Sequence, residues 1–300
     1  MHHHEHHQFQ VSTNFNSAFL FAILLNFCFV LIEALFGEHA NSMSLLSDAV
    51  HNLGDVLGLV LSWGAYLLMG KAANTTYSYG FKQISILAAL SNALILIMSS
   101  ILIAYGAIKK LIYITPVDSK IVIFVAGIGL IINFTTALFF MPHSKKDLNL
   151  KGAYLHLLSD GLLALAVVVS GLLIYWTGRM WIDPLISLII VGVIVWNTSA
   201  LLRASWRLIL AATPLEVDLP SVRDYLLNLP DVIGLHDLHI WGLSTQEVAL
   251  TAHLVLNEKK TFDYHSINEE LSERFHIKHI TLQIEFQDSD FKCCQLEHGC

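Results

Sequence analysis

The chain has 300 residues, of which 55% are hydrophobic and only 14% are charged. Soluble domains carry about 25% charged residues, so the composition indicates a membrane protein. The formal net charge of −7, with histidine counted as neutral, argues against a nucleic-acid partner.

The N-terminal tail, residues 1–14, contains the run His2-His3-His4-Glu5-His6-His7. A purification tag would explain such a run, but the interrupting Glu5 and the lack of a linker favour a native tail that attracts metal. The first apolar segment behind it is long enough to span a bilayer, so no cleavable signal peptide is expected.

Six apolar segments are each long enough to cross a hydrocarbon core of about 30 Å, which takes about 20 residues. They cover residues 15–36, 43–69, 84–108, 119–141, 152–176 and 183–204. We therefore expect a transmembrane all-α bundle of six helices at residues 15–207. Most lysines and arginines of the short links favour a cytosolic location for both termini, and Lys109, Lys110 and Lys120 are exceptions to that trend.

After about residue 212 the hydrophobicity falls and the pattern changes. Helical spacing and strand-like alternation follow each other in the order helix, strand, strand, helix, strand, at residues 219–229, 232–241, 247–256, 262–275 and 279–286. This order predicts a small α+β domain at residues 213–287, with one helical layer on a short sheet. In the last segment, residues 288–300, the cysteines Cys293, Cys294 and Cys300 cluster, and in a reducing compartment such thiols suggest metal binding more than disulfides.

Two identical steps inside apolar segments, His51-x-x-x-Asp55 and His156-x-x-x-Asp160, are the most informative feature of the sequence. Ionisable side chains at bilayer depth cost several kcal/mol each and rarely persist without a function. An i, i+4 step places both side chains on one helix face. Two such pairs that face each other supply four ligands, the number that a tetrahedral Zn²⁺ requires.

Asp48 lies three residues before His51 and faces roughly the same side of the predicted helix. It is a candidate for a secondary proton or ion site, and an acid near the interface at a helix N-terminus is an equally good interpretation. Other polar residues in the spans hold helices together or line the pathway, namely Asn26, Glu33, Asn92 and Asn133. Glu33, near the far end of the first span, is the one of these four for which no specific role is assigned.

The chemistry of a site with two histidines and two aspartates suggests a mechanism. Imidazole and carboxylate groups must be deprotonated to bind a metal, so loading releases protons and protons compete for the empty site. Histidine titrates near pH 6.5 when it is unperturbed. If the site opens alternately to each face of the membrane, metal moves in exchange for protons, which is antiport.

The sequence resembles the cation diffusion facilitator family, and in particular its bacterial zinc, cadmium and cobalt efflux branch, over about residues 15–287. The resemblance rests on the block Ser44-Leu45-Leu46-Ser47-Asp48-Ala49-x-His51-x-x-x-Asp55 and on His156-x-x-Ser159-Asp160. It also rests on His236-Asp237-Leu238-His239-Ile240-Trp241 and Thr251-Ala252-His253. It implies a homodimer, embedded in a bacterial inner membrane if the source is bacterial, that exports divalent metal from the cytosol in exchange for protons.

The resemblance also assigns ligands residue by residue. The transport site falls on His51, Asp55, His156 and Asp160, and nitrogen ligands favour Zn²⁺ over Mn²⁺ or Mg²⁺, while Cd²⁺, Co²⁺ and Ni²⁺ stay open. The soluble domain is implied to be metallochaperone-like (ferredoxin-like), to dimerise and to bind regulatory metal. Its ligand positions fall on His236, His253, Glu285 and His265, with Gln283 where a histidine is expected.

Two further features complete the comparison with the family. The tail thiols Cys293 and Cys294 could complete the soluble site together with the histidine run, or both tails could bind metal independently. The link at residues 72–80 lacks the Asp and His of a third family site, so we expect no metal there, and the motif Tyr79-Gly80-x-Lys82 is interpreted as structural.

Alternative functions are less compatible with the sequence. An intramembrane metalloprotease would need a general base beside an open metal position, as in His-Glu-x-x-His, and the sequence contains no such motif. A membrane metal sensor would not need four intramembrane ligands, and an exporter of a different divalent metal is the remaining alternative.

Overall fold

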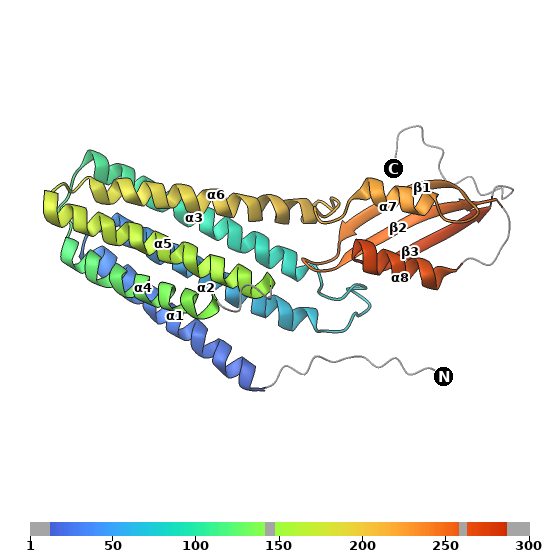
Figure 1. The fold of residues 1–300 in the computed structure, drawn as a ribbon, viewed down its shortest axis with the longest axis horizontal. Helices are drawn as coiled ribbons and strands as arrows, with labels where there is room; N and C mark the ends of the chain where they lie inside the picture. Colours follow the sequence, from blue (N-terminus) through green and yellow to red (C-terminus); the bar gives the residue numbers. More distant parts are fainter. Residues whose placement is uncertain (1–12, 142–147, 258–262, 287–300) are drawn as a thin grey trace. The chain divides into compact units, whose positions relative to one another are not determined.

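The structure is a computed structural model that describes residues 13–141, 148–257 and 263–286. Six long helices come first, namely α1 (Thr13–His39), α2 (Met43–Met69), α3 (Ile84–Ile112), α4 (Ser119–Phe140), α5 (Leu148–Thr177) and α6 (Ile182–Ile209). They are followed by α7 (Leu219–Leu227), β1 (Val232–Gly242), β2 (Val248–Leu256), α8 (Tyr264–Phe275) and β3 (Ile277–Phe286), as labelled in Figure 1.

Five of the long helices, α2 to α6, are long and apolar enough to cross a membrane within the part of the chain that the structure describes. Large apolar side chains on them are mostly exposed, including Leu102 at 68%, Phe124 at 70% and Trp196 at 79%. Apolar surface on this scale is typical of helices that face lipid. The multi-pass membrane domain is therefore confirmed, whereas a sixth span at α1 stays a prediction.

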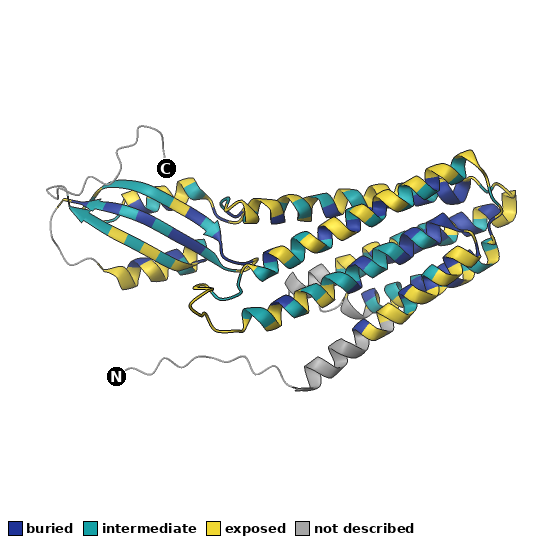
Figure 2. Ribbon diagram, turned by 180° about the vertical axis from the view of Figure 1, so that it is seen from behind, coloured by how far each residue is buried: buried dark blue, intermediate teal, exposed yellow. Residues whose placement is uncertain are grey.

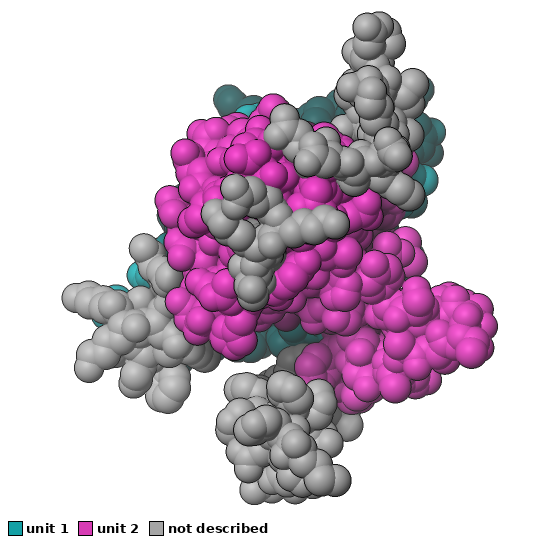
Figure 3. All heavy atoms as spheres, turned by 90° about the vertical axis from the view of Figure 1, so that its right-hand side faces the viewer, with its two compact units in different colours: residues 1–60, 92–199 teal, residues 61–91, 200–300 magenta. Residues whose placement is uncertain are grey.

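By its contacts the chain divides into two compact units, shown in different colours in Figure 3. One unit consists of residues 1–60 and 92–199, and the other of residues 61–91 and 200–300. The division runs through helices α2, α3 and α6. These helices contribute to both units, so the contact-based division does not follow the predicted change of composition near residue 212.

Within the first unit, a buried carboxylate of α6 caps the N-terminus of α2. Asp183 Oδ2 accepts a hydrogen bond from the Met43 backbone N–H at 2.6 Å, and Oδ1 accepts from the hydroxyls of Ser42 and Ser44 at 2.6 Å each and from the Ser44 N–H at 3.2 Å. The two backbone N–H groups lie in the first turn of α2, where no intrahelical partner is available. One turn further along, the hydroxyls of Ser47 and Ser187 lie 2.6 Å apart, so α2 is attached to α6 at two levels.

Helices α4 and α5 pack closely against each other at small residues. A Cβ atom at Gly161 would lie 2.6 Å from Cδ2 of Phe134, and one at Gly171 would lie 2.8 Å from Cγ1 of Ile123. The core of this unit combines α4, α5 and α6 with the start of α2. Close packing at Gly161 matters because that residue follows Asp160 directly.

The C-terminal part is the predicted α+β domain. Its three strands are ordered β1-β2-β3, with β1 and β2 antiparallel and β2 and β3 parallel. The parallel pair needs a crossover, which α8 provides. Helices α7 and α8 pack on one face of the sheet around Val222, Leu226, Ile267 and Leu271, and β2 alternates between buried and partly exposed residues, as Figure 2 shows.

The opposite face of the sheet carries polar side chains and contains a β-bulge. His236 pairs with His253 and His239 pairs with Thr251, so two residues of β1 face a single residue of β2. Asp237, at the bulge, has a φ of 54°, which is uncommon for a residue other than glycine. The bulge keeps His236 and His239 on one face and changes the direction of the Asp237 side chain.

The link between α2 and α3 makes structural contacts within the second unit. Gly80 has a φ of 66°, and a Cβ there would lie 3.2 Å from the Lys71 carbonyl oxygen. Lys82 forms an ion pair with Glu247, and the rings of Tyr79 and His279 meet edge to face at 5.3 Å. These contacts agree with a structural role for the Tyr79-Gly80-x-Lys82 motif.

Candidate metal sites

Helices α2 and α5 bring the two His-x-x-x-Asp steps together. His51 Nε2 lies 3.1 Å from Asp160 Oδ1 and 3.9 Å from Asp55 Oδ2. His156 Nε2 lies 3.7 Å from Asp55 Oδ2 and 3.6 Å from Asp160 Oδ2. Each histidine therefore contacts both carboxylates, and each helix contributes one nitrogen and one oxygen.

The spacing of three of these side chains, those of His51, Asp55 and Asp160, suits one small cation, and His156 is not part of that group. Ligand atoms about 2.1 Å from a tetrahedral zinc ion are about 3.4 Å from one another, and the four distances lie on either side of that value. Atoms of His51, Asp55 and Asp160 all lie within 4.8 Å of one another. The His156 side chain is 54% exposed, so it is the most accessible of the four.

A cavity of about 510 Å³ adjoins this cluster within the first unit. Its polar lining combines three of the four predicted ligands with three amides, namely Asp55, His156, Asp160, Asn26, Asn52 and Asn133. His51 is not part of the lining. The cavity thus adjoins three of the four predicted ligands.

Two buried acids lie near the cluster but outside it. Asp48 is 2% exposed and interacts electrostatically with His51, Asp55 and Asp160. Glu33, on α1, is fully buried and accepts a hydrogen bond from Asn52 Nδ2 at 2.8 Å. Among the residues whose side chains the structure describes, Asp48 Oδ2 and Glu33 Oε1 have no hydrogen-bond partner.

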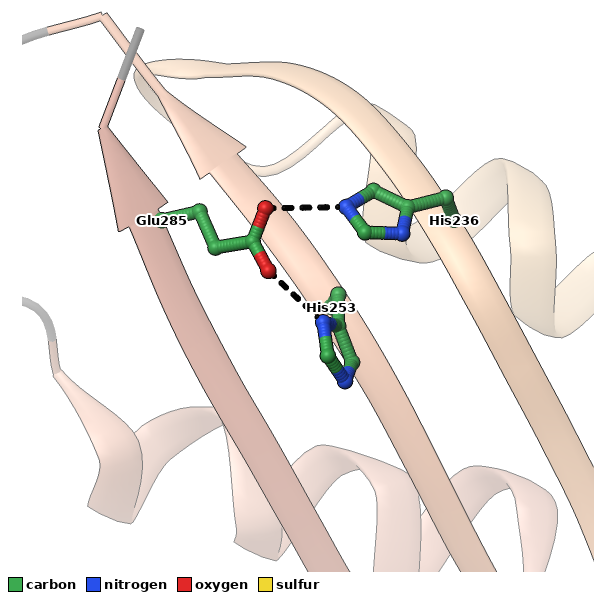
Figure 4. Close-up of side chains that lie close together, drawn as sticks. All are labelled: His236, His253 and Glu285. Carbon is green, nitrogen blue, oxygen red and sulfur yellow. Dashed lines mark hydrogen bonds and ion pairs between the residues drawn. The ribbon is translucent and has the colours of Figure 1, made fainter. Parts of the chain in front are cut away.

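A second cluster lies on the polar face of the sheet, with one residue from each strand, as shown in Figure 4. Glu285 on β3 bridges the two histidines, with Oε2 at 3.0 Å from His236 Nε2 and Oε1 at 2.7 Å from His253 Nδ1. The other nitrogen of His253, Nε2, lies 3.7 Å from Asp237 Oδ2. One carboxylate and two imidazoles form a suitable donor set for zinc.

The charge of Glu285 is stabilised by these neighbours. Burial acts to raise the pKa of its carboxyl group, but the hydrogen bonds from His253 and His236 act in the opposite direction, and the net effect lowers the pKa below its ordinary value of 4.5. Glu285 is therefore ionised, as a metal ligand must be. Gln283, at the departure from the family pattern, donates from Nε2 to Glu285 Oε1 at 3.2 Å, so it supports the carboxylate.

Of the remaining predicted ligands, His265 is described by the structure and does not join this cluster. The His265 side chain is 90% exposed, and its contact is with Glu269 on the same helix at 3.8 Å. Cys293 and Cys294 lie outside the residues that the structure describes, as does the N-terminal histidine run.

Three residues that contact the two clusters or the helices carrying them are not indicated by sequence patterns. Asp183 and Asn52 act through hydrogen bonds to residues on other helices, which helical periodicity does not report. Asp237 reaches His253 only because of the bulge. The sequence sign of this bulge is the spacing of His236 and His239, which a regular strand would place on opposite faces.

Two family models match this arrangement of helices followed by a soluble domain. Residues 19–210, well over half of the chain, match the cation efflux transmembrane domain, and residues 214–287 match the cytoplasmic domain of cation efflux proteins. The chain belongs to the cation efflux family. The resemblance to the zinc, cadmium and cobalt branch of cation diffusion facilitators is thereby confirmed, since its relatives come from that branch.

Three curated relatives show how far the similarity extends. The metal cation efflux system protein CzcD of Cupriavidus metallidurans is 33% identical over 267 residues, or 88% of this chain and 84% of that protein. The cadmium, cobalt and zinc/H⁺-K⁺ antiporter of Bacillus subtilis is 32% identical, over 86% of this chain and 85% of that protein. The zinc transporter ZitB of Escherichia coli is 28% identical, over 93% and 90%.

These matches establish the function at a coarse level. This cation efflux protein is a transporter rather than an enzyme, and metal cation efflux is its activity. It is a multi-pass integral membrane protein with metal ions as substrates, and its cytoplasmic-domain match supports dimerisation.

Proposed function

We propose that this protein exports Zn²⁺ from the cytosol in exchange for protons, through a site formed by His51, Asp55, His156 and Asp160. The observation that carries the proposal is the convergence of these four side chains from α2 and α5, at 3.1–3.9 Å. Cd²⁺ and Co²⁺ are the further substrates that this donor set and the names of the relatives suggest.

Proton coupling follows from the ligand chemistry. All four side chains must be deprotonated to hold a metal, so metal and protons compete for the same atoms. A site that faces the proton-rich side of the membrane loses metal to protons, and a site that faces the cytosol exchanges them back. The Bacillus subtilis relative, whose name describes an antiporter that uses H⁺, supports this coupling.

The proposed organisation has six spans with both termini in the cytosol. It consists of the histidine-rich tail 1–14, a transmembrane domain at 15–207, an α+β domain at 213–287 and the cysteine-rich tail 288–300. The protein acts as a homodimer in a bacterial inner membrane, and His236, His253 and Glu285 bind a regulatory metal. The donor set and spacing of these three residues fit zinc.

Three predicted ligands have less structural support in this proposal. The exposed His265 reaches a metal only if the partner protomer or another segment of the chain contributes the remaining ligands. Cys293 and Cys294 follow β3 within a few residues and are proposed as tail ligands. Asp48 is proposed as a proton site beside the pathway, because it is buried and interacts with three of the four transport ligands.

Transport of labelled Zn²⁺ into inverted membrane vesicles tests the function. We expect uptake that depends on an imposed pH gradient and that Asp160→Ala abolishes. A matched control is Asp218→Ala, which replaces an aspartate at the N-cap of α7 in the soluble domain, outside either cluster. Uptake without a pH gradient, or unchanged uptake in Asp160→Ala, would overturn the proposal.

A further inference from the structure

The cavity beside the transport cluster has one polar wall residue whose orientation is fixed from behind. Asn52, Asp55, Val56 and Leu59 all line the cavity, and their spacing of i, i+3, i+4 and i+7 is that of a single helix face. Asn52 thus lies on the same stripe of α2 as Asp55, one turn away.

Glu33 determines which end of the Asn52 amide is available. Asn52 Nδ2 donates to Glu33 Oε2 at 2.8 Å, and Glu33 is fully buried and does not line the cavity. The amide nitrogen is therefore the end of Asn52 that faces Glu33. The carbonyl oxygen Oδ1 is then the polar atom that Asn52 can offer to the cavity.

The surroundings of Glu33 leave few other partners for it. From α4, a Cβ at Gly129 would lie only 3.4 Å from Glu33 Oε1, so the backbone of that helix approaches the carboxyl group closely. From α2, Asp48 and His51 act on Glu33 electrostatically, while Asn52 is the residue that forms a hydrogen bond with it. Burying a carboxyl group in this way is unfavourable unless it is hydrogen-bonded.

We propose that Asn52 is a cation-contacting residue of the cavity, and that Glu33 acts as a positioning residue that holds the Asn52 carbonyl oxygen toward the incoming ion. The proposal rests on the transport function proposed above. The ligand is a hydrated divalent cation, which the neutral oxygen contacts directly or through a bound water before the ion reaches His51. A neutral amide oxygen suits this step because it attracts the cation without competing with the charged ligands for it.

A structural explanation for the pair is the alternative to exclude. Asn52 could serve only to satisfy the buried Glu33, without contacting the cation. In that case, replacing both residues by leucine removes donor and acceptor together, which is nearly neutral for a buried pair. The double variant therefore separates the two explanations. Its KM for the cation stays raised only if Asn52 contacts the cation.

The experiment measures initial rates of Zn²⁺ uptake by the full-length protein in proteoliposomes, over a range of Zn²⁺ concentrations. We expect Asn52→Leu to raise KM about three- to tenfold, the effect of one lost hydrogen bond or polar contact, with kcat nearly unchanged. Glu33→Leu, which frees the amide to rotate, should raise KM similarly. Glu33→Gln, which keeps an acceptor oxygen, should restore a KM near that of the parent.

The double variant Asn52→Leu/Glu33→Leu is expected to keep the raised KM of Asn52→Leu, although its elution and thermal stability recover relative to the single variants. A parental KM in the double variant, or in Asn52→Leu, would overturn the proposal. Asn52→Ala removes the same oxygen and replaces Asn52→Leu if that variant does not fold. Asn197→Leu, at an exposed amide of α6 that does not line the cavity, is the matched control and should keep the parental KM.

Parental uptake and its loss in Asp160→Ala are measured in the same preparation. If the parent does not transport Zn²⁺, the proposed function fails. If the parent transports and Asp160→Ala does not, while Asn52→Leu leaves KM unchanged, only the role of Asn52 fails.

Discussion

Replacing Asp183 by asparagine should destabilise the membrane domain more than any other single polar change at the α2–α6 contact. The carboxylate accepts four hydrogen bonds, and Ser42 and Ser44 are fully buried, so water cannot replace it. An asparagine has a single acceptor oxygen, and its NH₂ group would face N–H and O–H donors. Leaving buried donors unpaired costs about 1–3 kcal/mol, and the lost charge at the helix N-terminus costs about 0.3–2 kcal/mol more.

The Ser47–Ser187 pair provides the internal reference for this prediction. Ser187→Ala removes one hydroxyl–hydroxyl contact of 2.6 Å, and hydrogen bonds between membrane helices contribute only about 0.6 kcal/mol on average. We therefore expect Asp183→Asn to lose several times more stability than Ser187→Ala, in unfolding measurements of the purified protein in mixed micelles. Similar losses in the two variants would show that Asp183 is not the cap of α2 that the structure indicates.

Three further predictions concern the two clusters and their support. His51→Asp replaces a nitrogen ligand by oxygen and should relax discrimination against Mn²⁺ in competition uptake by about tenfold or more, since even outer partners of metal ligands change affinity by about 10–100-fold. Gly161→Ala introduces a methyl group 2.6 Å from Phe134 and should destabilise the α4–α5 contact by about 1–3 kcal/mol, with slower transport because Asp160 is displaced; parental stability and rate would contradict this. For Glu285 the pKa is lowered on folding, so the unfolded chain binds more protons and stability rises with pH. The contribution of Glu285 to the free energy of unfolding is complete above its ordinary pKa of 4.5. It is lost as the pH falls through the lower pKa of the folded state. In urea titrations of the metal-free protein, the difference between parent and Glu285→Gln should therefore shrink with acidification, and a difference that grows would refute the assigned hydrogen bonds.

Features that depend on local spacing could be predicted from the sequence alone. The i, i+4 relation places His51 with Asp55 and His156 with Asp160 on one helix face regardless of tertiary structure. The alternation of β2 likewise predicts which of its residues face α7 and α8. The element order of the α+β domain is therefore confirmed, with its ends shifted by at most two residues, as at β3, which begins at Ile277 instead of 279.

Features that depend on long-range contacts could not be predicted in the same way. His236, His253 and Glu285 come from three strands, and their meeting depends on a bulge and on a parallel register that no local pattern encodes. The family resemblance, rather than periodicity, identified them. Glu33 could be recognised as an unusual buried acid, but its partner Asn52 lies on another helix, so its role required the structure.

The two clusters use the same side-chain chemistry but are held differently, and the difference fits different tasks. Glu285 and its two histidines lie on adjacent strands of one sheet, at 2.7–3.0 Å, so their spacing is fixed by the backbone ladder. The proposed transport ligands lie on two helices, and three of their four distances are 3.6–3.9 Å. Small displacements of α5 relative to α2 change these distances without breaking backbone hydrogen bonds, because each helix satisfies its own. If the cluster on α2 and α5 releases its ion on every cycle, as proposed, it needs this freedom, whereas a site that holds a resident ion is better built on a sheet.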